Sequence, residues 1–160
     1  MRHFIFAAAL FAAASAFAQA PTIQVDHPWA RATAPNAKAG GVFMTLTDSG
    51  GVDRLVSASS PVAGMVEVHR TVEENGVMKM LPVEAIDLVP GKSVTLAPGG
   101  YHVMLMDLRR QLKQGETFPL TLTFAKAAPV TVTVKVEAPG ASAPGHDMHS
   151  MPGMTMVPKP

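Results

Sequence analysis

The sequence has 160 residues, with 13 Lys and Arg against 12 Asp and Glu, 11 Met and no Cys. Without Cys, the chain cannot be a thiol–disulfide oxidoreductase, and it cannot hold a Cys-ligated electron-transfer copper. Its balanced charge lacks the basic face that a nucleic-acid partner requires.

The N-terminus has the pattern of a signal peptide. A basic start that includes Arg2 precedes an apolar run over residues 4–17, which is too short to span a bilayer, and small residues follow at Ala16 and Ala18. We expect a signal peptide over residues 1–18, with Ala20 as a second possible cleavage point. No later apolar run is long enough to cross a membrane, so we expect an exported, soluble, periplasmic protein without a membrane span.

Residues 21–138 predict a single all-β domain. Alternation with period two is clearest at residues 118–124 and 130–136. Further strands are expected at residues 23–26, 42–47, 55–58, 65–72, 77–83, 93–96 and 101–105. Turn signals separate them at residues 49–51, 75–76, 90–91 and 98–100, and residues 107–114 could form a short helical turn. This spacing predicts a Greek-key β-sandwich or barrel.

A hairpin around Asn75 and Gly76 would bring candidate ligands together. If these two residues form the turn, Glu74 lies opposite Val77, and His69 shares a face with Met78 and Met80. Met80 is then diagonal to His69. The core side would carry Val66, Val68, Leu81 and Val83. A register slip by one residue would separate His69 from Met80.

His102 and Met104 form the second half of the candidate site. Residues two apart in a strand point the same way, so both would project from one face. Two imidazoles and two thioethers suit Cu(I), because thioether sulfur is soft and uncharged and offers little to Zn²⁺, Ca²⁺ or Mg²⁺. A Met or a His taken alone is more often a core or surface residue than a ligand. Met78 and Met106 share the ligand faces by parity, so they could shield the copper from water or take part in its transfer. Core packing is the safer interpretation of Trp29, Met44 and Met65.

The spacing of these residues resembles the signature of the periplasmic copper chaperones of the PCu(A)C family. That signature is a His, a Met eleven positions later, and His-x-Met beginning twenty-two positions after that Met, which here are His69, Met80, His102 and Met104. The resemblance extends to residues 29–31, 53–56, 66–69, 76–80, 98–102 and 119–124. Asp107 departs from it, since Gly is more usual there.

The resemblance implies a cupredoxin-like fold, a non-enzymatic role and delivery of Cu(I) to the Cu(A) subunit of cytochrome c oxidase. A thiol-containing copper chaperone is a further candidate partner, and a monomer is expected.

Residues 139–160 predict a disordered tail rich in His and Met. Imidazoles would favour Cu(II) and thioethers Cu(I), which makes the tail an auxiliary copper site with candidate ligands His146, Met148, His149, Met151, Met154 and Met156. Such a tail keeps a copper-sequestering or resistance protein open as the alternative. A copper enzyme and a structural adhesion-type sandwich are weaker competitors, since the first would need more imidazole ligands and the second leaves the Met and His pattern unexplained.

Overall fold

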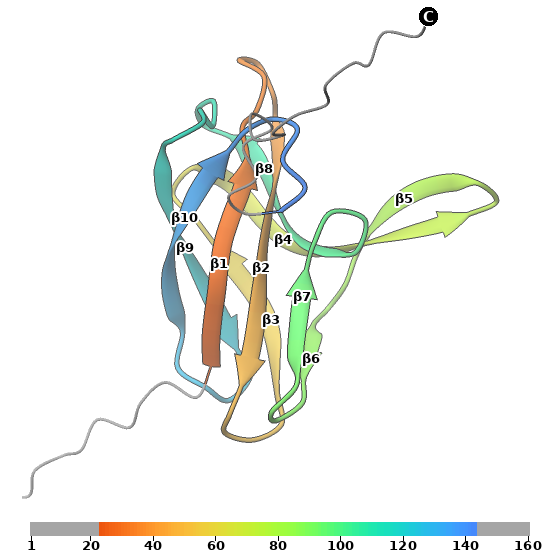
Figure 1. Cartoon of the computed structure of the whole chain (residues 1–160), viewed down its shortest axis with the longest axis vertical. Coiled ribbons are helices and arrows are strands. Elements are labelled where there is room, and N and C mark those ends of the chain that lie inside the picture. Colours follow the sequence, from red (N-terminus) through yellow and green to blue (C-terminus); the bar gives the residue numbers. More distant parts are fainter. Residues whose placement is uncertain (1–22, 144–160) are drawn as a thin grey trace, which may run out of the picture.

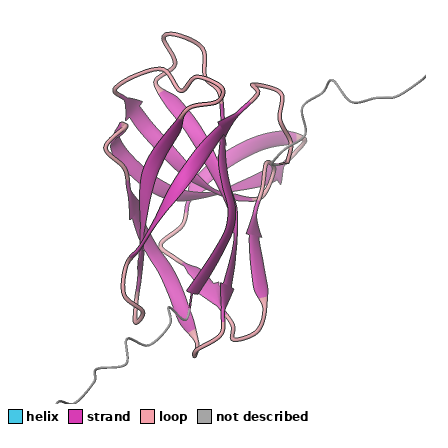
Figure 2. Cartoon of the chain, turned by 60° about the vertical axis from the view of Figure 1, so that its left-hand side comes forward, coloured by secondary structure: helices cyan, strands magenta, loops and turns pink. Residues whose placement is uncertain are grey.

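The structure is a computed structural model that describes residues 23–143, and Figure 2 shows this part of the chain as strands and loops without a helix. The expectation of an all-β fold is confirmed. The ten strands, in chain order, are β1 (Ile23–Arg31), β2 (Ala39–Asp48), β3 (Asp53–Ser59), β4 (Ala63–Glu74), β5 (Val77–Pro82), β6 (Ile86–Leu88), β7 (Ser93–Leu96), β8 (Tyr101–Leu108), β9 (Thr117–Phe124) and β10 (Val130–Glu137). Since these residues contain no helix, none of them forms a helical membrane span. The expected signal peptide and most of the expected tail lie outside the described residues.

Nine strands form one hydrogen-bonded path in the order β5-β4-β8-β2-β1-β10-β9-β3-β6. β1 and β10 pair in parallel, and the other pairs are antiparallel. One edge of β2 divides between two partners, because residues 39–42 pair with β8 and residues 44–47 pair with β7. The β4–β5 hairpin extends away from the rest of the sheet as a two-stranded ribbon (Figure 1).

Alternate residues of β2, β4 and β8 face the core and the outside. Val42, Val68 and Val103 are buried in the main core cluster, together with Leu105. Val103 pairs with Val42 on one side and with Val68 on the other. Residues one position along these strands therefore point to the outer face of the sheet, which is the face that matters for function.

The hairpin register is confirmed. Glu74 pairs with Val77, Thr71 pairs with Met80, and His69 pairs with Pro82. Asn75 and Gly76 have φ of 53° and 76°, the left-handed values that a two-residue hairpin turn of type I′ requires. The turn chemistry thus sets which side chains of β5 share a face with His69.

Several local expectations are wrong. Leu81 and Met65 are not in the core, since they are 45% and 50% exposed. Leu81 lies on the ribbon, which has no second layer to cover it. Sequence reasoning also missed β6, which has three residues and too little alternation to be recognised.

The helical turn expected over residues 107–114 does not form. Asp107 has φ of 51°, a left-handed conformation in which Gly is favoured and which cannot begin a right-handed helix. Strand β8 runs on to Leu108, and Leu112 then enters the core, with its N–H donating to the Thr33 hydroxyl at 3.1 Å. Burial of Leu112 and this side-chain bond hold the segment as a loop.

The first residues of the expected tail belong to the folded domain. Ala141 is buried in a small cluster with Trp29 and Phe43, and its carbonyl accepts a hydrogen bond from Arg31 Nε at 2.6 Å. Linker-like composition at residues 139–143 concealed this packing.

Candidate metal centre

The pairing of β4 with β8 places two candidate ligands directly opposite each other. His69 is the cross-strand partner of His102, and their ring centroids are 5.9 Å apart. Met104 lies two residues along β8 on the same face, opposite Glu67. Both imidazoles are almost buried, with His69 8% and His102 3% exposed.

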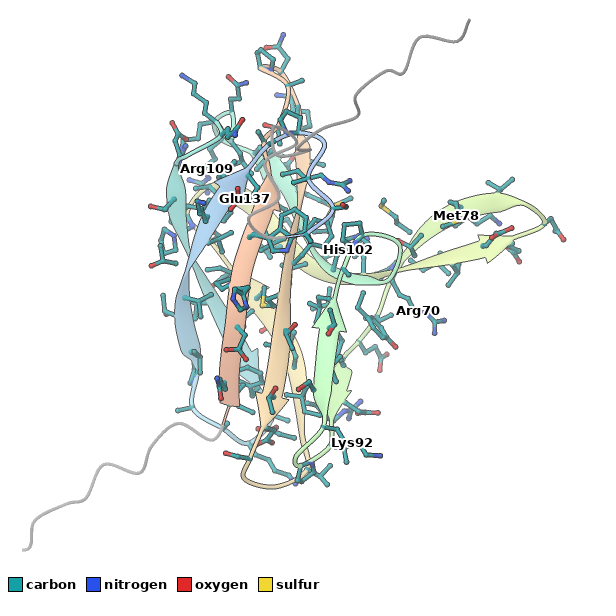
Figure 3. All side chains as sticks on the ribbon, in the orientation of Figure 1. Arg70, Met78, Lys92, His102, Arg109 and Glu137 are labelled. Carbon is teal, nitrogen blue, oxygen red and sulfur yellow. The ribbon has the colours of Figure 1, made fainter. Side chains whose placement is uncertain are left out.

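Met80 approaches from the ribbon. It pairs with Thr71, one cross-strand position beyond His69 on the same face, and is 57% exposed. In Figure 3 the ribbon that carries the labelled Met78 stands out to the side of the strand that carries His102. The four predicted ligands therefore come from β4, β5 and β8, with one thioether on the projecting element.

A cavity of about 220 Å³ lies at this point on the outer face. His102, Met104 and Met80 line it. His69 is not among the lining residues, but its ring lies 5.9 Å from that of His102. The full lining consists of Arg31, Ala39, Gly40, Gly41, Phe43, Thr71, Met80, Pro98, Gly99, His102 and Met104. The lining of the cavity is mostly apolar.

Hydrogen bonds fix the tautomers of both imidazoles. His69 Nε2–H donates to the Glu67 carboxylate at 2.8 Å, and His102 Nδ1–H donates to the Gly100 carbonyl at 3.2 Å. The Gly100 carbonyl also accepts the Thr71 N–H at 3.0 Å, which ties the loop before β8 to β4. Each ring then has one nitrogen with a free lone pair, as a ligating His does when its other nitrogen is held by a neighbour.

The free nitrogens of the two rings are the chemically unusual feature of this region. His69 Nδ1 and His102 Nε2 are buried and have no hydrogen-bond partner in the described part of the chain. An unpaired buried polar atom costs about 1–3 kcal/mol, so a native structure that keeps two of them together calls for an explanation. A soft cation bound by both nitrogens would satisfy them, and the thioethers of Met104 and Met80, which line the same cavity as His102, are ligands that such a cation prefers.

The environment of His102 favours its neutral form. Burial lowers the pKa of His102, the Gly100 carbonyl partly opposes this, and the nearby His69 lowers the pKa further. A neutral imidazole offers its lone pair, which is the state in which His binds a metal.

Aromatic side chains close the side of the cavity that faces β1. The Phe43 ring lies 6.3 Å from the His102 ring and 4.7 Å from the Trp29 ring, centroid to centroid. Gly41 leaves room for it, because a Cβ there would come within 3.1 Å of the Phe43 ring. The Arg31 guanidinium stacks over Phe43 at 5.9 Å.

The remaining predicted residues lie at different distances from the cavity. Met106 is partly exposed on the outer face, two residues beyond Met104, and Met78 lies farther out on the ribbon; neither lines the cavity. The tail candidates His146, Met148, His149, Met151, Met154 and Met156 lie outside the described residues. Within residues 23–143, no group of three or more His, Cys, Asp or Glu is placed so that it could hold a metal ion.

Sequence reasoning missed Glu67, Gly100, Phe43 and Arg31. Glu67 had a usable signal, since it lies two residues before His69 and must share its face in a strand. The other three depend on which strands become neighbours, and that is not visible in a local pattern.

Comparison with known proteins covers the same region. A family model described as "Putative lipoprotein LpqE-like" matches residues 23–136, which include the four candidate ligands. "Putative lipoprotein Lxx21020" of Leifsonia xyli subsp. xyli is 35% identical over 121 residues, which are 73% of this chain and 72% of the relative.

Two solved structures share the fold. The copper-bound PCuAC domain from PmoF2 is 34% identical, with a TM-score of 0.63, over 74% of this chain and 94% of that domain. The solution structure of CuI-DR1885 from Deinococcus radiodurans is 33% identical, with a TM-score of 0.56, over 76% of this chain and 83% of that one. These proteins are described as a lipoprotein and as copper-carrying structures, not as enzymes.

Proposed function

Since the chain belongs to the LpqE-like family and has the cupredoxin-like β fold of PCuAC domains, we propose that it is a periplasmic copper metallochaperone that binds Cu(I) through His69, Met80, His102 and Met104. The observation that carries this proposal is the pair of buried imidazole nitrogens without a hydrogen-bond partner among the described residues, His69 Nδ1 and His102 Nε2, on rings whose centroids are 5.9 Å apart. His102 lines the cavity together with Met80 and Met104. Copper in the related PmoF2 domain and Cu(I) in DR1885 support the choice of ion.

The geometry suits a carrier that must release its ion. Neutral thioether ligands leave no buried thiolate charge to be rehydrated when copper departs. Met80 stands on an exposed ribbon that contacts the domain through β4, so a recipient can replace it first. His102, almost buried and fixed by Gly100, would hold the ion until the last exchange.

The Cu(A) subunit of cytochrome c oxidase is the proposed recipient, with a thiol-containing copper chaperone as an additional partner. This part of the proposal rests on the resemblance to PCu(A)C chaperones. The cavity contributes a compatible surface, since an open, mostly apolar rim admits another protein's soft ligands.

The tail is proposed as an auxiliary copper site, with its imidazoles open to Cu(II) and its thioethers to Cu(I). Ala141 packs against Phe43, whose ring neighbours His102, so the chain leaves the domain beside the cavity. Ligands that follow Ala143 would therefore start close to the core centre. If the tail stores several ions and no recipient exists, the protein is a copper-sequestering one instead.

The test is an anaerobic Cu(I) competition titration of the mature chain and of a version that ends at Ala143. One tight equivalent in the shorter version, lost in His102→Ala/Met104→Leu and kept in the buried control Met44→Leu, is the expected result. Tight binding that survives the double substitution would refute the core site. Several tight equivalents that depend on the tail would favour sequestration.

A further inference from the structure

Three cross-strand pairs follow one another along the outer face of β4 and β8. After His69–His102 come Glu67–Met104 and then Met65–Met106. Direct partners in an antiparallel pair point to the same side of the sheet. The row therefore continues from the imidazoles to three thioethers, those of Met65, Met104 and Met106.

Met65 is not used for packing. Its side chain is half exposed, whereas its neighbour Val66 packs against the core from the opposite face. Met106 is only partly buried on the same outer face, next to the fully buried Leu105. Core filling, the ordinary role of Met in a strand, does not account for a pair placed like this.

The spacing allows the three sulfurs to meet. Directly opposed residues have Cβ atoms about 5 Å apart, and residues two apart on a strand or on the diagonal are about 7 Å apart. Met has three rotatable side-chain bonds, so its sulfur can move several ångströms from where it rests. Gly41 and Ala39, which pair with Met104 and Met106 on β2, have almost no side chain of their own, although the Phe43 ring lies close to Gly41.

We propose that Met65, Met104 and Met106 form a second, sulfur-only site for Cu(I), with Met104 as the ligand common to both sites. The inference rests on the proposed function only for the role of Met104. An ion can pass between the two sites by exchanging His69, His102 and Met80 for the Met65 and Met106 thioethers while Met104 stays bound. Because a thioether trio is neutral and open to solvent, it holds Cu(I) more weakly than the buried centre and serves as its entry or exit point.

The test uses the full mature chain labelled with ¹³C at its Met methyl groups, titrated with silver nitrate. Ag(I) is a soft, redox-stable substitute for Cu(I), and each methyl signal is assigned by a Met→Leu substitution. The first equivalent should shift the signals of Met80 and Met104. Further Ag(I) should shift Met65 and Met106 together.

Met65→Leu decides whether the two methionines share an ion. It should raise the Ag(I) concentration that half-shifts the Met106 signal at least about tenfold, the low end of the effect of removing a metal-site partner. The buried control Met44→Leu should leave that concentration unchanged. Met65 and Met106 signals that stay in place, or a Met106 response that ignores Met65→Leu, would overturn the inference. Failure of the Met80 and Met104 signals to respond would instead refute the proposed function.

Discussion

Replacing Glu67 with Ala removes the carboxylate that accepts the Nε2 proton of His69 at 2.8 Å. That proton determines which nitrogen of His69 is free, and the free nitrogen, Nδ1, is buried without a partner among the described residues. Loss of a partner that orients a metal-binding His typically costs about 10- to 100-fold in affinity. We therefore expect Glu67→Ala to weaken Cu(I) binding by about 1.4 to 2.7 kcal/mol.

Glu67→Gln separates orientation from charge. The amide oxygen can still accept the Nε2 proton, but a neutral hydrogen bond is worth roughly half of a charge-assisted one. Half of the free-energy loss corresponds to about 3- to 10-fold weaker binding. Gln should therefore lie between Glu and Ala.

The assay is anaerobic competition with a coloured Cu(I) chelator at pH 7, on the version that ends at Ala143, so that tail ligands do not contribute. Glu73→Ala is the matched control, since Glu73 is an exposed carboxylate farther along the same strand. Equal affinities for Glu67→Ala and Glu73→Ala would show that the His69 tautomer does not depend on Glu67, and the reasoning would fail.

Further predictions concern three other residues: Met80, His102 and Asp53. Met80→Leu should weaken Cu(I) binding at least about tenfold in the same titration, whereas Met78→Leu, equally exposed on the ribbon but away from the cavity, should change it little. Burial lowers the pKa of His102, so Cu(I) affinity should begin to fall only below pH 6.5, about the reference pKa of His. The fall should be incomplete, because protons do not compete for thioether sulfur. Affinities measured from pH 7.5 to 4.5 check this. The same shift makes the unfolded chain take up the His102 proton first, so metal-free stability is full above about pH 6.5 and declines with acid, which thermal unfolding at several pH values would show. Burial alone would raise the pKa of Asp53, but the backbone N–H groups of Arg54, Lys126 and Ala127 hold it below 3.8. The stabilisation by Asp53 is therefore present above that pH and is lost as the pH falls further. Asp53→Ala should lower the free energy of unfolding, measured in urea at pH 7, by about 2–3 kcal/mol.

Local patterns predicted the parts of the fold that local chemistry determines. The Asn75–Gly76 turn fixes the register of β4 and β5, and strand parity places His102 and Met104 on one face. Leu81 was assigned to the core because alternation shows which residues share a face but not whether a second layer covers it. The core assignment of Met65 was wrong for another reason: it followed the usual packing role of Met, although parity places Met65 on the face of His69.

The candidate site was predictable as a set of residues and not as an arrangement. His69 meets His102 because β4 pairs with β8, and residues 75–100, which include β5, β6 and β7, separate those two strands in sequence. No turn signal encodes such a long-range pairing. The roles of Phe43 and Arg31 depend on β1 and β2 joining the same sheet, and that also follows only from the complete fold.

Core residues and candidate ligands occupy opposite faces of β4 and β8. Val68, Val103 and Leu105 anchor β4 and β8 in the core, while His69, His102 and the thioethers occupy alternate positions on the outside. Met80 is 57% exposed, so Met80→Leu removes little buried apolar surface and should impair copper binding while leaving most of the stability intact. Asp53 bonds to the loop between β9 and β10, far from these ligands along the sheet order, so Asp53→Ala should do the reverse. Measuring Cu(I) affinity and unfolding free energy on both kinds of variant tests this independence, and a ligand variant that unfolds as readily as Asp53→Ala would contradict it.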